Sequence, residues 1–226
     1  MTPAAITIGV TEDTRVSGVF MRAPNAQACF VFAHGAGAGM HHPSMATIAA
    51  ELAQLGVATL RYQFPYMEQG RKRPDPPAIC HATVRAAVTE ANRLAPDLPL
   101  FAGGRSFGGR MTSQAQAATP LPGVRGLVFL AFPLHPAQKP SQERAHHLFD
   151  VKIPMLFLQG TRDELASLDL LEPLVARLGE GTTLVLAPDA DHSFHVPARS
   201  GRKDADVRRE LLEAMRAWMQ SIIRGS

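Results

Sequence analysis

The stretch Gly104-Arg105-Ser106-Phe107-Gly108 decides how this sequence of 226 residues is interpreted. It follows the short apolar run 98–102 and precedes residues 109–118, which have the pattern of a helix. A serine between two glycines at a strand-to-helix turn lies on a strained backbone that exposes its hydroxyl. We therefore expect Ser106 to act as a nucleophile. The alternative is that Ser106 only caps the helix that follows.

Apolar segments alternate with helical segments on both sides of this turn. Strands are predicted over residues 6–10, 16–21, 29–33, 57–62, 98–102, 126–132, 153–159 and 182–186. Helices are predicted over residues 45–55 (capped by Ser44), 78–94, 109–118, 141–149, 167–178 and 204–223, and a Pro-rich loop over 63–77. Near-continuous apolar strands that alternate with helices are typical of a mostly parallel sheet covered on both faces. No internal repeat or linker divides the chain, so we expect one α/β domain over residues 1–226.

Composition and charge exclude several classes of protein. The chain has a net charge of +3, but its basic residues do not form dense clusters interleaved with aromatic residues. We therefore expect no nucleic-acid partner. No apolar run approaches the roughly 20 residues that span a membrane, and the N-terminus lacks a secretory pattern. Cys29 and Cys80 have the pattern of buried reduced thiols, which favours a cytoplasmic protein.

Three chemically reactive residues follow three different strands. Ligands bind beyond the carboxyl ends of the strands in parallel sheets, and these ends carry Ser106, Asp163 and His192. A serine hydroxyl attacks a carbonyl only when an imidazole accepts its proton, and that imidazole needs a carboxylate to fix its tautomer. We therefore predict that these three residues are catalytic.

Neighbouring residues leave alternatives open for two of the three positions. Glu164 and Asp191 compete with Asp163 as the acid, and His195 competes with His192 as the base. Asp163 is preferred because a short acid directly after a strand is held more rigidly, and His192 because it follows its strand more closely.

Backbone amides are expected to bind the oxyanion, because they are fixed before the reaction begins. The predicted donors are Phe107, at the start of the serine helix, and Ala36 in the glycine-rich loop 34–39, with Gly37 as the alternative. That loop lacks the spacing of a phosphate-binding motif. The histidine pairs lack a convincing carboxylate or cysteine set, so we expect no metal and no cofactor.

Several side chains are predicted to line the substrate pocket. Phe64 and Tyr66 follow the strand 57–62, and we expect them to wall an apolar acyl pocket. Arg105 is expected to meet an anionic substrate group or to pair with an acid such as Asp75. His135 follows the strand 126–132 and is expected at the mouth of the site.

The sequence resembles the α/β-hydrolase superfamily, and more narrowly the small dienelactone-hydrolase-related group that includes KANL/TEX-type hydrolase-like proteins. The stretches that carry the resemblance are His34-Gly35-Ala36-Gly37, His42-Pro43, Phe64-Pro65-Tyr66, Arg73-Pro74-Asp75, Gly104-Arg105-Ser106-Phe107-Gly108-Gly109, Phe132-Pro133-Leu134-His135-Pro136 and Asp191-His192-Ser193-Phe194. The chain departs from dienelactone hydrolases proper, which have a cysteine nucleophile where this chain has Ser106.

This resemblance implies an α/β-hydrolase fold with helices on both faces of the sheet and a Ser106–Asp163–His192 triad. Only about twenty residues, 133–152, stand where related enzymes carry a lid, so we expect an open site with a minimal cap. The expected function is a serine hydrolase that cleaves a small carboxylic ester or thioester as a monomer or homodimer. The alternative is a non-catalytic hydrolase-fold module that binds a ligand or serves in a complex.

Overall fold

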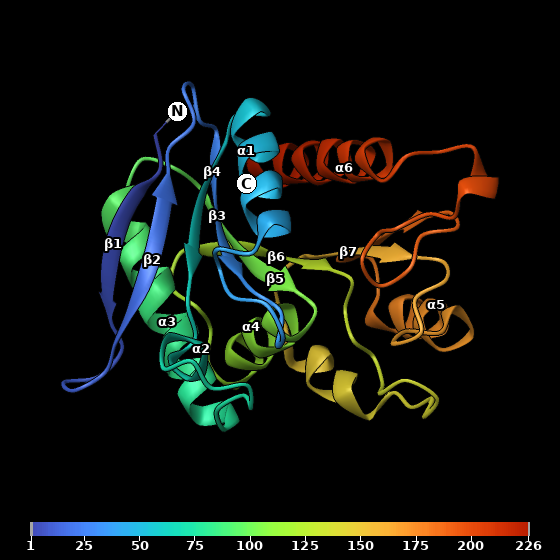
Figure 1. Ribbon diagram of the computed structural model, residues 1–226, viewed down its shortest axis with the longest axis horizontal. Helices are drawn as coiled ribbons and strands as arrows, with labels where there is room; N and C mark the ends of the chain where they lie inside the picture. Colours follow the sequence, from blue (N-terminus) through green and yellow to red (C-terminus); the bar gives the residue numbers. More distant parts are fainter. Residues whose placement is uncertain (1, 226) are drawn as a thin grey trace.

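The computed structural model describes residues 2–225 and contains one eight-stranded sheet (Figure 1). The strand order is β1-β2-β4-β3-β5-β6-β7-β8. The strands are β1 (Ala4–Gly9), β2 (Arg15–Met21), β3 (Ala28–Ala33), β4 (Val57–Tyr62), β5 (Leu100–Arg105), β6 (Val124–Leu130), β7 (Met155–Gly160) and β8 (Thr182–Ala187). Within residues 2–225, the β1–β2 and β2–β4 pairs are antiparallel, and every pair from β4 to β8 in the sheet order is parallel, as the apolar strands predicted.

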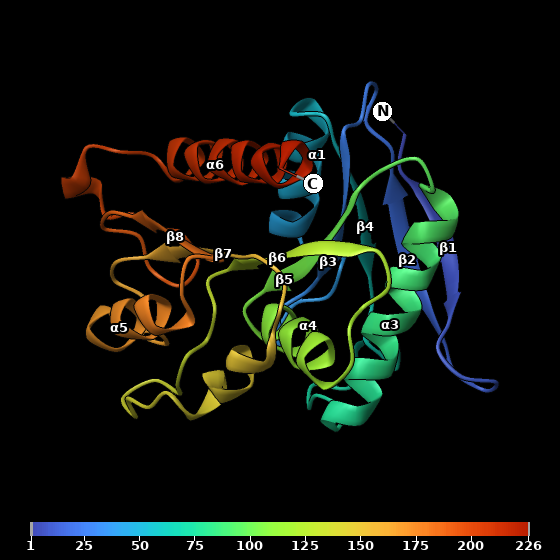
Figure 2. The ribbon, with the colours of Figure 1, turned by 180° about the vertical axis from the view of Figure 1, so that it is seen from behind.

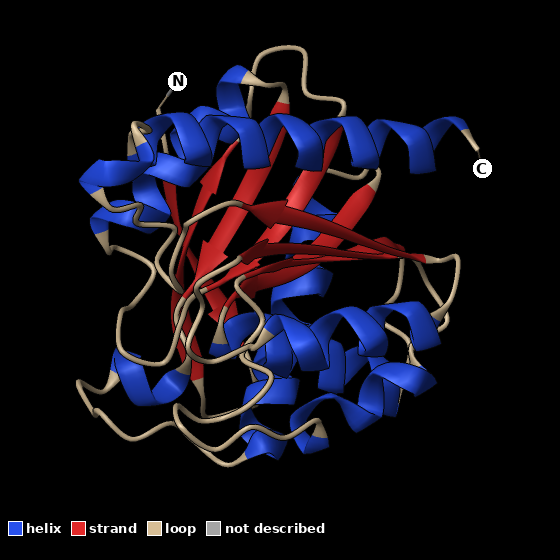
Figure 3. Cartoon of the chain, turned by 90° about the vertical axis from the view of Figure 1, so that its right-hand side faces the viewer, coloured by secondary structure: helices blue, strands red, loops and turns tan. Residues whose placement is uncertain are grey.

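Helices cover both faces of the sheet (Figure 3). They are α1 (Pro43–Gln54), α2 (Pro65–Glu68), α3 (Pro77–Leu94), α4 (Phe107–Ala118), α5 (Leu168–Leu178) and α6 (Asp204–Arg224), with 3-10 helices η1 (Glu143–Asp150) and η2 (Ala198–Ser200). Helices α1 and α6 lie on one face, and α3, α4 and α5 lie on the other (Figure 2). This arrangement is the α/β-hydrolase fold that the sequence indicated.

The side chains of each strand point alternately to the two faces of the sheet, and this divides the core into two layers. In β3, Val31 joins the apolar cluster under α3 and α4, whereas Phe30 and Phe32 join the cluster under α1 and α6. Successive side chains of a strand point to opposite faces, so a strand that is apolar throughout has to be covered twice. Cys29 and Cys80 are buried free thiols, as predicted.

The element boundaries differ from prediction in two informative places. Helix α1 begins at Pro43, so His42 rather than Ser44 is its N-cap, and the His42 imidazole accepts the Ser44 amide at 3.2 Å. The predicted loop 63–77 contains the one-turn helix α2, which begins at a proline because proline suits the first helical position. Within residues 2–225, no helix has the length and apolar character needed to span a membrane.

Candidate active site

The turn after β5 holds Ser106 in a conformation that few residues adopt. Its φ is 48° and its ψ is −116°, and its amide donates to the Leu130 carbonyl at 3.0 Å, continuing the β5–β6 pairing. Such a backbone is strained and persists only where neighbouring contacts hold it. Ser106 stands at the N-cap position of α4, yet its side chain makes no capping hydrogen bond. The interpretation of Ser106 as a simple helix cap is therefore wrong.

The two flanking glycines make this turn possible because it packs against the end of β3. A Cβ at Gly104 would lie 2.5 Å from the Ala33 carbonyl oxygen, and one at Gly108 would lie 2.5 Å from the His34 carbonyl oxygen. Both distances are far below van der Waals contact with backbone atoms. A larger residue at either position would push the serine turn away from the sheet edge.

Ser106, His192 and Asp163 form a continuous chain of hydrogen bonds. The His192 Nε2 lies 2.8 Å from the Ser106 Oγ, and its Nδ1 lies 2.7 Å from the Asp163 Oδ2. A carboxylate only accepts, so the Nδ1 carries a proton and the Nε2 is the acceptor that faces the serine hydroxyl. The histidine side chain is 25% exposed, whereas the aspartate side chain is fully buried.

Buried donors fix the Asp163 carboxylate. The Leu165 amide donates to Oδ1 at 2.8 Å, and the Gln159 side-chain amide donates to Oδ2 beside the imidazole. Gln159 is itself oriented, since its Oε1 accepts the Phe132 amide at 2.9 Å. Gln159 was not predicted from the sequence, although it is the one polar side chain in the otherwise apolar β7, and the structure buries it fully.

The loop that carries His192 is tied to the loop that carries Asp163. The Thr161 and Arg162 amides donate to the Ala187 and Ala190 carbonyls at 3.0 and 2.9 Å, which extends the β7–β8 pairing. The backbone carbonyl of Ala190 lies so close to Gly160 that no side chain fits there.

The alternative acids and base lie elsewhere. Asp191 accepts the Ser193 and His195 amides at 2.7 and 2.9 Å and so shapes the turn. His195 pairs with Asp204 at 2.9 Å on the surface. Glu164 is exposed and makes no hydrogen bond within residues 2–225.

The two predicted oxyanion donors lie close to Ser106. Phe107 is the first residue of α4, so its amide has no partner within the helix. Ala36 and Ser106 line the same cavity. Within the described chain, the Ala36 amide donates to no backbone carbonyl.

A buried imidazole orients the Ala36 amide. The His34 Nε2 accepts the Phe64 amide at 3.1 Å, so its Nδ1 carries the proton and donates to the Gly35 carbonyl at 2.7 Å. In a planar trans peptide the N–H points opposite to the C=O, so the Ala36 amide points away from the His34 ring. Burial lowers the pKa of His34 to about 4, which keeps it neutral in this role.

Ser106 opens into a cavity of about 390 Å³, here called the loop cavity, walled by residues 35–38, Arg105 and His192. The Arg105 guanidinium lies 3.4 Å from the His192 carbonyl oxygen. Burial lowers the pKa of Arg105, while Asp191 and Asp163 act to raise it. The suggested pairing of Arg105 with Asp75 is wrong, because Asp75 binds Arg71 at 2.6 Å.

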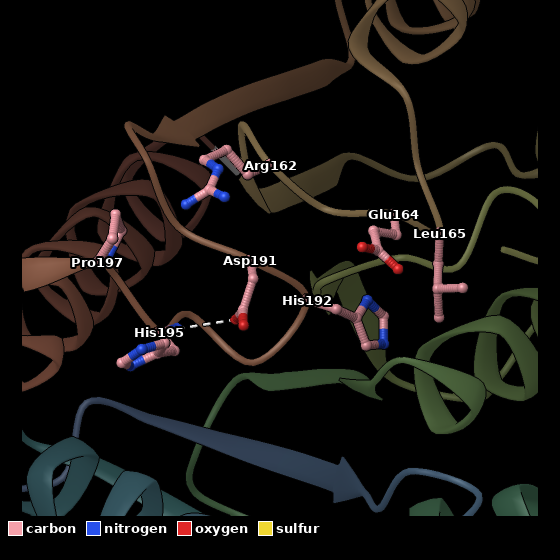
Figure 4. A pocket seen from close by; sticks show the side chains of 7 residues that line it. All are labelled: Arg162, Glu164, Leu165, Asp191, His192, His195 and Pro197. Carbon is pink, nitrogen blue, oxygen red and sulfur yellow. Dashed lines mark hydrogen bonds between the residues drawn. The ribbon is translucent and has the colours of Figure 1, made fainter. Parts of the chain in front are cut away.

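A second cavity, of about 590 Å³, is also lined by His192 and is here called the histidine cavity (Figure 4). The His192 ring lies between Asp191 on one side and Glu164 and Leu165 on the other (Figure 4). His192 thus borders two cavities. Between β6 and β7 the only helical element within the described residues is η1, in keeping with a minimal cap.

Three residues expected to contact substrate are buried instead. Phe64 and Tyr66 are fully buried in the core, and the Tyr66 hydroxyl donates to the Ala36 carbonyl at 2.9 Å. Helix α2 turns both rings inward, so they support the glycine loop rather than wall a pocket. His135 is 3% exposed, and its Nε2 accepts the Ser167 amide at 3.0 Å. The expectation that Phe64, Tyr66 and His135 contact the substrate is therefore wrong.

Comparisons with known proteins agree with the fold described above. Residues 26–220 match the family described as an alpha/beta hydrolase domain. Among solved structures, dienelactone hydrolase from Anabaena variabilis is similar at 21% identity and a TM-score of 0.78, with 97% of each chain covered.

Two further structures carry the same fold. A serine hydrolase without a lid from Xanthomonas campestris is similar at 24% identity and a TM-score of 0.74, over 96% of this chain and 94% of that one. Est1E from Butyrivibrio proteoclasticus is similar at 16% identity and a TM-score of 0.72, over 97% and 99%. The family match spans most of the sequence, so the chain belongs to the α/β-hydrolase domain family.

Proposed function

We propose that this chain is a serine hydrolase that cleaves a carboxylic ester or thioester through an acyl-enzyme intermediate. The observation that carries this proposal is the aligned chain of hydrogen bonds from the Ser106 Oγ through His192 to the Asp163 carboxylate. Est1E and the other hydrolases of the same fold add support at the level of the reaction class.

In the proposed acylation step, the Ser106 Oγ attacks the substrate carbonyl carbon while the His192 Nε2 takes the hydroxyl proton. Asp163 holds the ring and stabilises the imidazolium that forms. The negative charge that develops on the carbonyl oxygen is bound by the amides of Phe107 and Ala36, with the positive end of the α4 dipole behind Phe107.

The intermediate then collapses, the bond to the alcohol or thiol breaks, and the imidazolium gives its proton to that leaving group. In the second half-reaction, His192 takes a proton from a water molecule that attacks the acyl-enzyme, and Ser106 is released with its proton restored. The net reaction consumes one water molecule and yields an acid and an alcohol or thiol.

A fluorophosphonate probe tests the nucleophile directly. We expect the wild-type protein to be labelled at Ser106 and the Ser106→Ala variant to remain unlabelled. Ser113→Ala is the matched control, because the Ser113 Oγ also lies 2.7 Å from a histidine ring nitrogen, that of His147, but is buried. This control should label like the wild type.

The alternative function is a non-catalytic binding module built on the same fold. Thermal unfolding of each variant establishes that it is folded before labelling is compared. Folded wild-type protein that resists the probe, and that hydrolyses no ester or thioester in a panel of varied chain length, would favour the binding module.

A further inference from the structure

A third cavity touches Ser106 and is not lined by His192. It has a volume of about 440 Å³, and its lining residues include Ala36, Ser106 and Phe107 as well as Arg110 and Arg144. Arg110 comes from α4 and Arg144 from η1, which pack against each other (Figure 2). We call this cavity the arginine pocket.

Neither arginine has an anionic partner within residues 2–225. Arg110 and Arg144 take part in no ion pair and no side-chain hydrogen bond there. The Arg110 Nε is buried without an acceptor, and its guanidinium lies 5.9 Å from the centre of the Phe107 ring. A buried donor without an acceptor costs free energy, so this guanidinium is suited to an external acceptor.

The acid that borders the arginine pocket does not neutralise it. Asp75 is only 3% exposed in its side chain, its Oδ1 is held by Arg71, and its Oδ2 accepts the Tyr66 amide at 2.7 Å. Burial and the neighbouring charge of Arg144 both lower the pKa of Arg110. The pocket therefore presents two unbalanced positive charges.

Arg105, the other cation near the serine, has a different environment. Two carboxylates, Asp191 and Asp163, favour its charge, and its guanidinium lies on the His192 carbonyl. An anionic ligand therefore gains more from the arginine pocket than from Arg105.

The position of His192 decides which part of a substrate enters the arginine pocket. The leaving group must receive its proton from the His192 Nε2, so it departs through the loop or histidine cavity, both of which His192 lines. The arginine pocket touches Ser106 and both predicted oxyanion donors but not His192. It is thus suited to the acyl group.

Resting on the hydrolase function proposed above, we propose that the acyl group of the substrate ends in a carboxylate that the two arginines bind. The substrate class is the half-ester or half-thioester of a short dicarboxylic acid. Arg110 follows Ser106 by one helical turn, and residues four apart on a helix lie only about 6 Å apart at their Cβ atoms, so the acyl chain is short. Hydrolysis consumes water and releases the free dicarboxylate and the alcohol or thiol.

Matched fluorogenic esters test this specificity. The 4-methylumbelliferyl half-ester of adipic acid is compared with the hexanoate ester of the same chain length and with the methyl-capped adipate, which lacks the charge. We expect kcat/KM for the half-ester to exceed both by about 10- to 100-fold, because a charge-assisted bidentate contact is gained. Added salt should reduce the preference.

Arg110→Gln and Arg144→Gln should each abolish most of this preference, measured as the ratio of kcat/KM for the half-ester to kcat/KM for the hexanoate. Arg216→Gln, an exposed arginine on α6, is the matched control and should retain the preference. The Arg144 side chain makes no hydrogen bond and no ion pair within residues 2–225, so that variant stays informative even if Arg110→Gln is unstable.

The outcomes separate this inference from the proposed function. Hydrolysis of neutral esters without preference for the half-ester would overturn the inference and leave the hydrolase intact. A preference that survives both substitutions would also overturn it and point to Arg105 instead. Absence of any hydrolysis, together with absence of probe labelling, would count against the proposed function itself.

Discussion

Helix α4 begins with one serine–histidine pair and contains another two turns further on. The Ser106 Oγ lies 2.8 Å from the His192 Nε2, and the Ser113 Oγ lies 2.7 Å from the His147 Nε2. The lengths are nearly the same, but the direction of the hydrogen bond differs. Ser113 lies 3.0 Å from the Arg110 carbonyl and donates to it, so it can only accept from the His147 ring.

The surroundings differ as well. His192 has Asp163 behind it, and the Ser106 hydroxyl faces cavities. For His147 no carboxylate hydrogen bond exists within the described residues, and burial together with the nearby Arg110 lowers its pKa to about 4. A short distance between serine and histidine is therefore not enough for base catalysis. The third residue, the strained turn and access to a cavity distinguish the two pairs.

The largest predicted difference between the two serine–histidine pairs is the loss of activity when each histidine is replaced. His192→Ala should lower kcat/KM on a short aryl ester by at least about 10³-fold, because the serine loses its proton acceptor. His147→Gln should stay close to the wild-type rate. If the two variants lost activity equally, the distinction between the pairs would collapse.

The acid behind His192 is the next test. Asp163→Asn should lower kcat by at least about 10³-fold, because an amide no longer fixes the Nδ1-protonated tautomer. Asp191→Asn is the control, since an asparagine oxygen still accepts the two amides that shape its turn. Steady-state kinetics of both variants, at matched thermal stability, provide the measurement. Near-normal turnover of Asp163→Asn would remove Asp163 from the proposed mechanism.

Gln159 is predicted to have a smaller effect as a positioning residue. Gln159→Leu frees one oxygen of the Asp163 carboxylate and lets the histidine ring drift, and displacements of about 1 Å cost on the order of 10²-fold in rate. We expect kcat to fall by about 10- to 100-fold while KM stays unchanged. An altered KM with unchanged kcat would contradict a positioning role.

The smallest effect concerns the dependence of stability on pH. His34 has a folded pKa of about 4, below its ordinary value of 6.5, so it contributes stability above pH 6.5 that is lost as the pH falls towards 4. The free energy of unfolding in urea should fall by about 2 to 3 kcal/mol between pH 7 and pH 4.5 from this residue. His147 acts in the same direction.

Replacing His34 by Gln should flatten this dependence while lowering stability at pH 7. An equal slope in wild type and variant would show that His34 does not titrate on unfolding in this range.

The order of elements and the three residues at the sheet edge could be predicted because apolar runs end visibly in the sequence. Ser106, Asp163 and His192 each follow such a run within a few residues, and parallel strands bring their carboxyl ends to one edge. The structure brings these three side chains together. Their catalytic role remains a prediction.

The residues that line the site were harder to predict. An aromatic after a strand, such as Tyr66, either walls a pocket or packs into the core, and only the direction of α2 decides between them. Gln159 was overlooked because its function depends on a partner four residues away whose carboxylate turns back towards it. Arg110 has the sequence pattern of an ordinary residue on a helix surface. Its proximity to Arg144 of η1, which lines the same cavity, could not be predicted from the sequence.

The close contact between the Ala190 backbone and Gly160 determines where the chain can accept insertions without disturbing the active site. The segments bearing Asp163 and His192 are locked to each other at a point where no side chain fits, so they move as one body. The span joining β6 to β7, by contrast, makes no hydrogen bond to His192 in the part of the chain that is described. Phe132, at the start of that span, still orients Gln159. Insertions after residue 136 should therefore change which substrates the protein accepts without displacing the serine, histidine and aspartate.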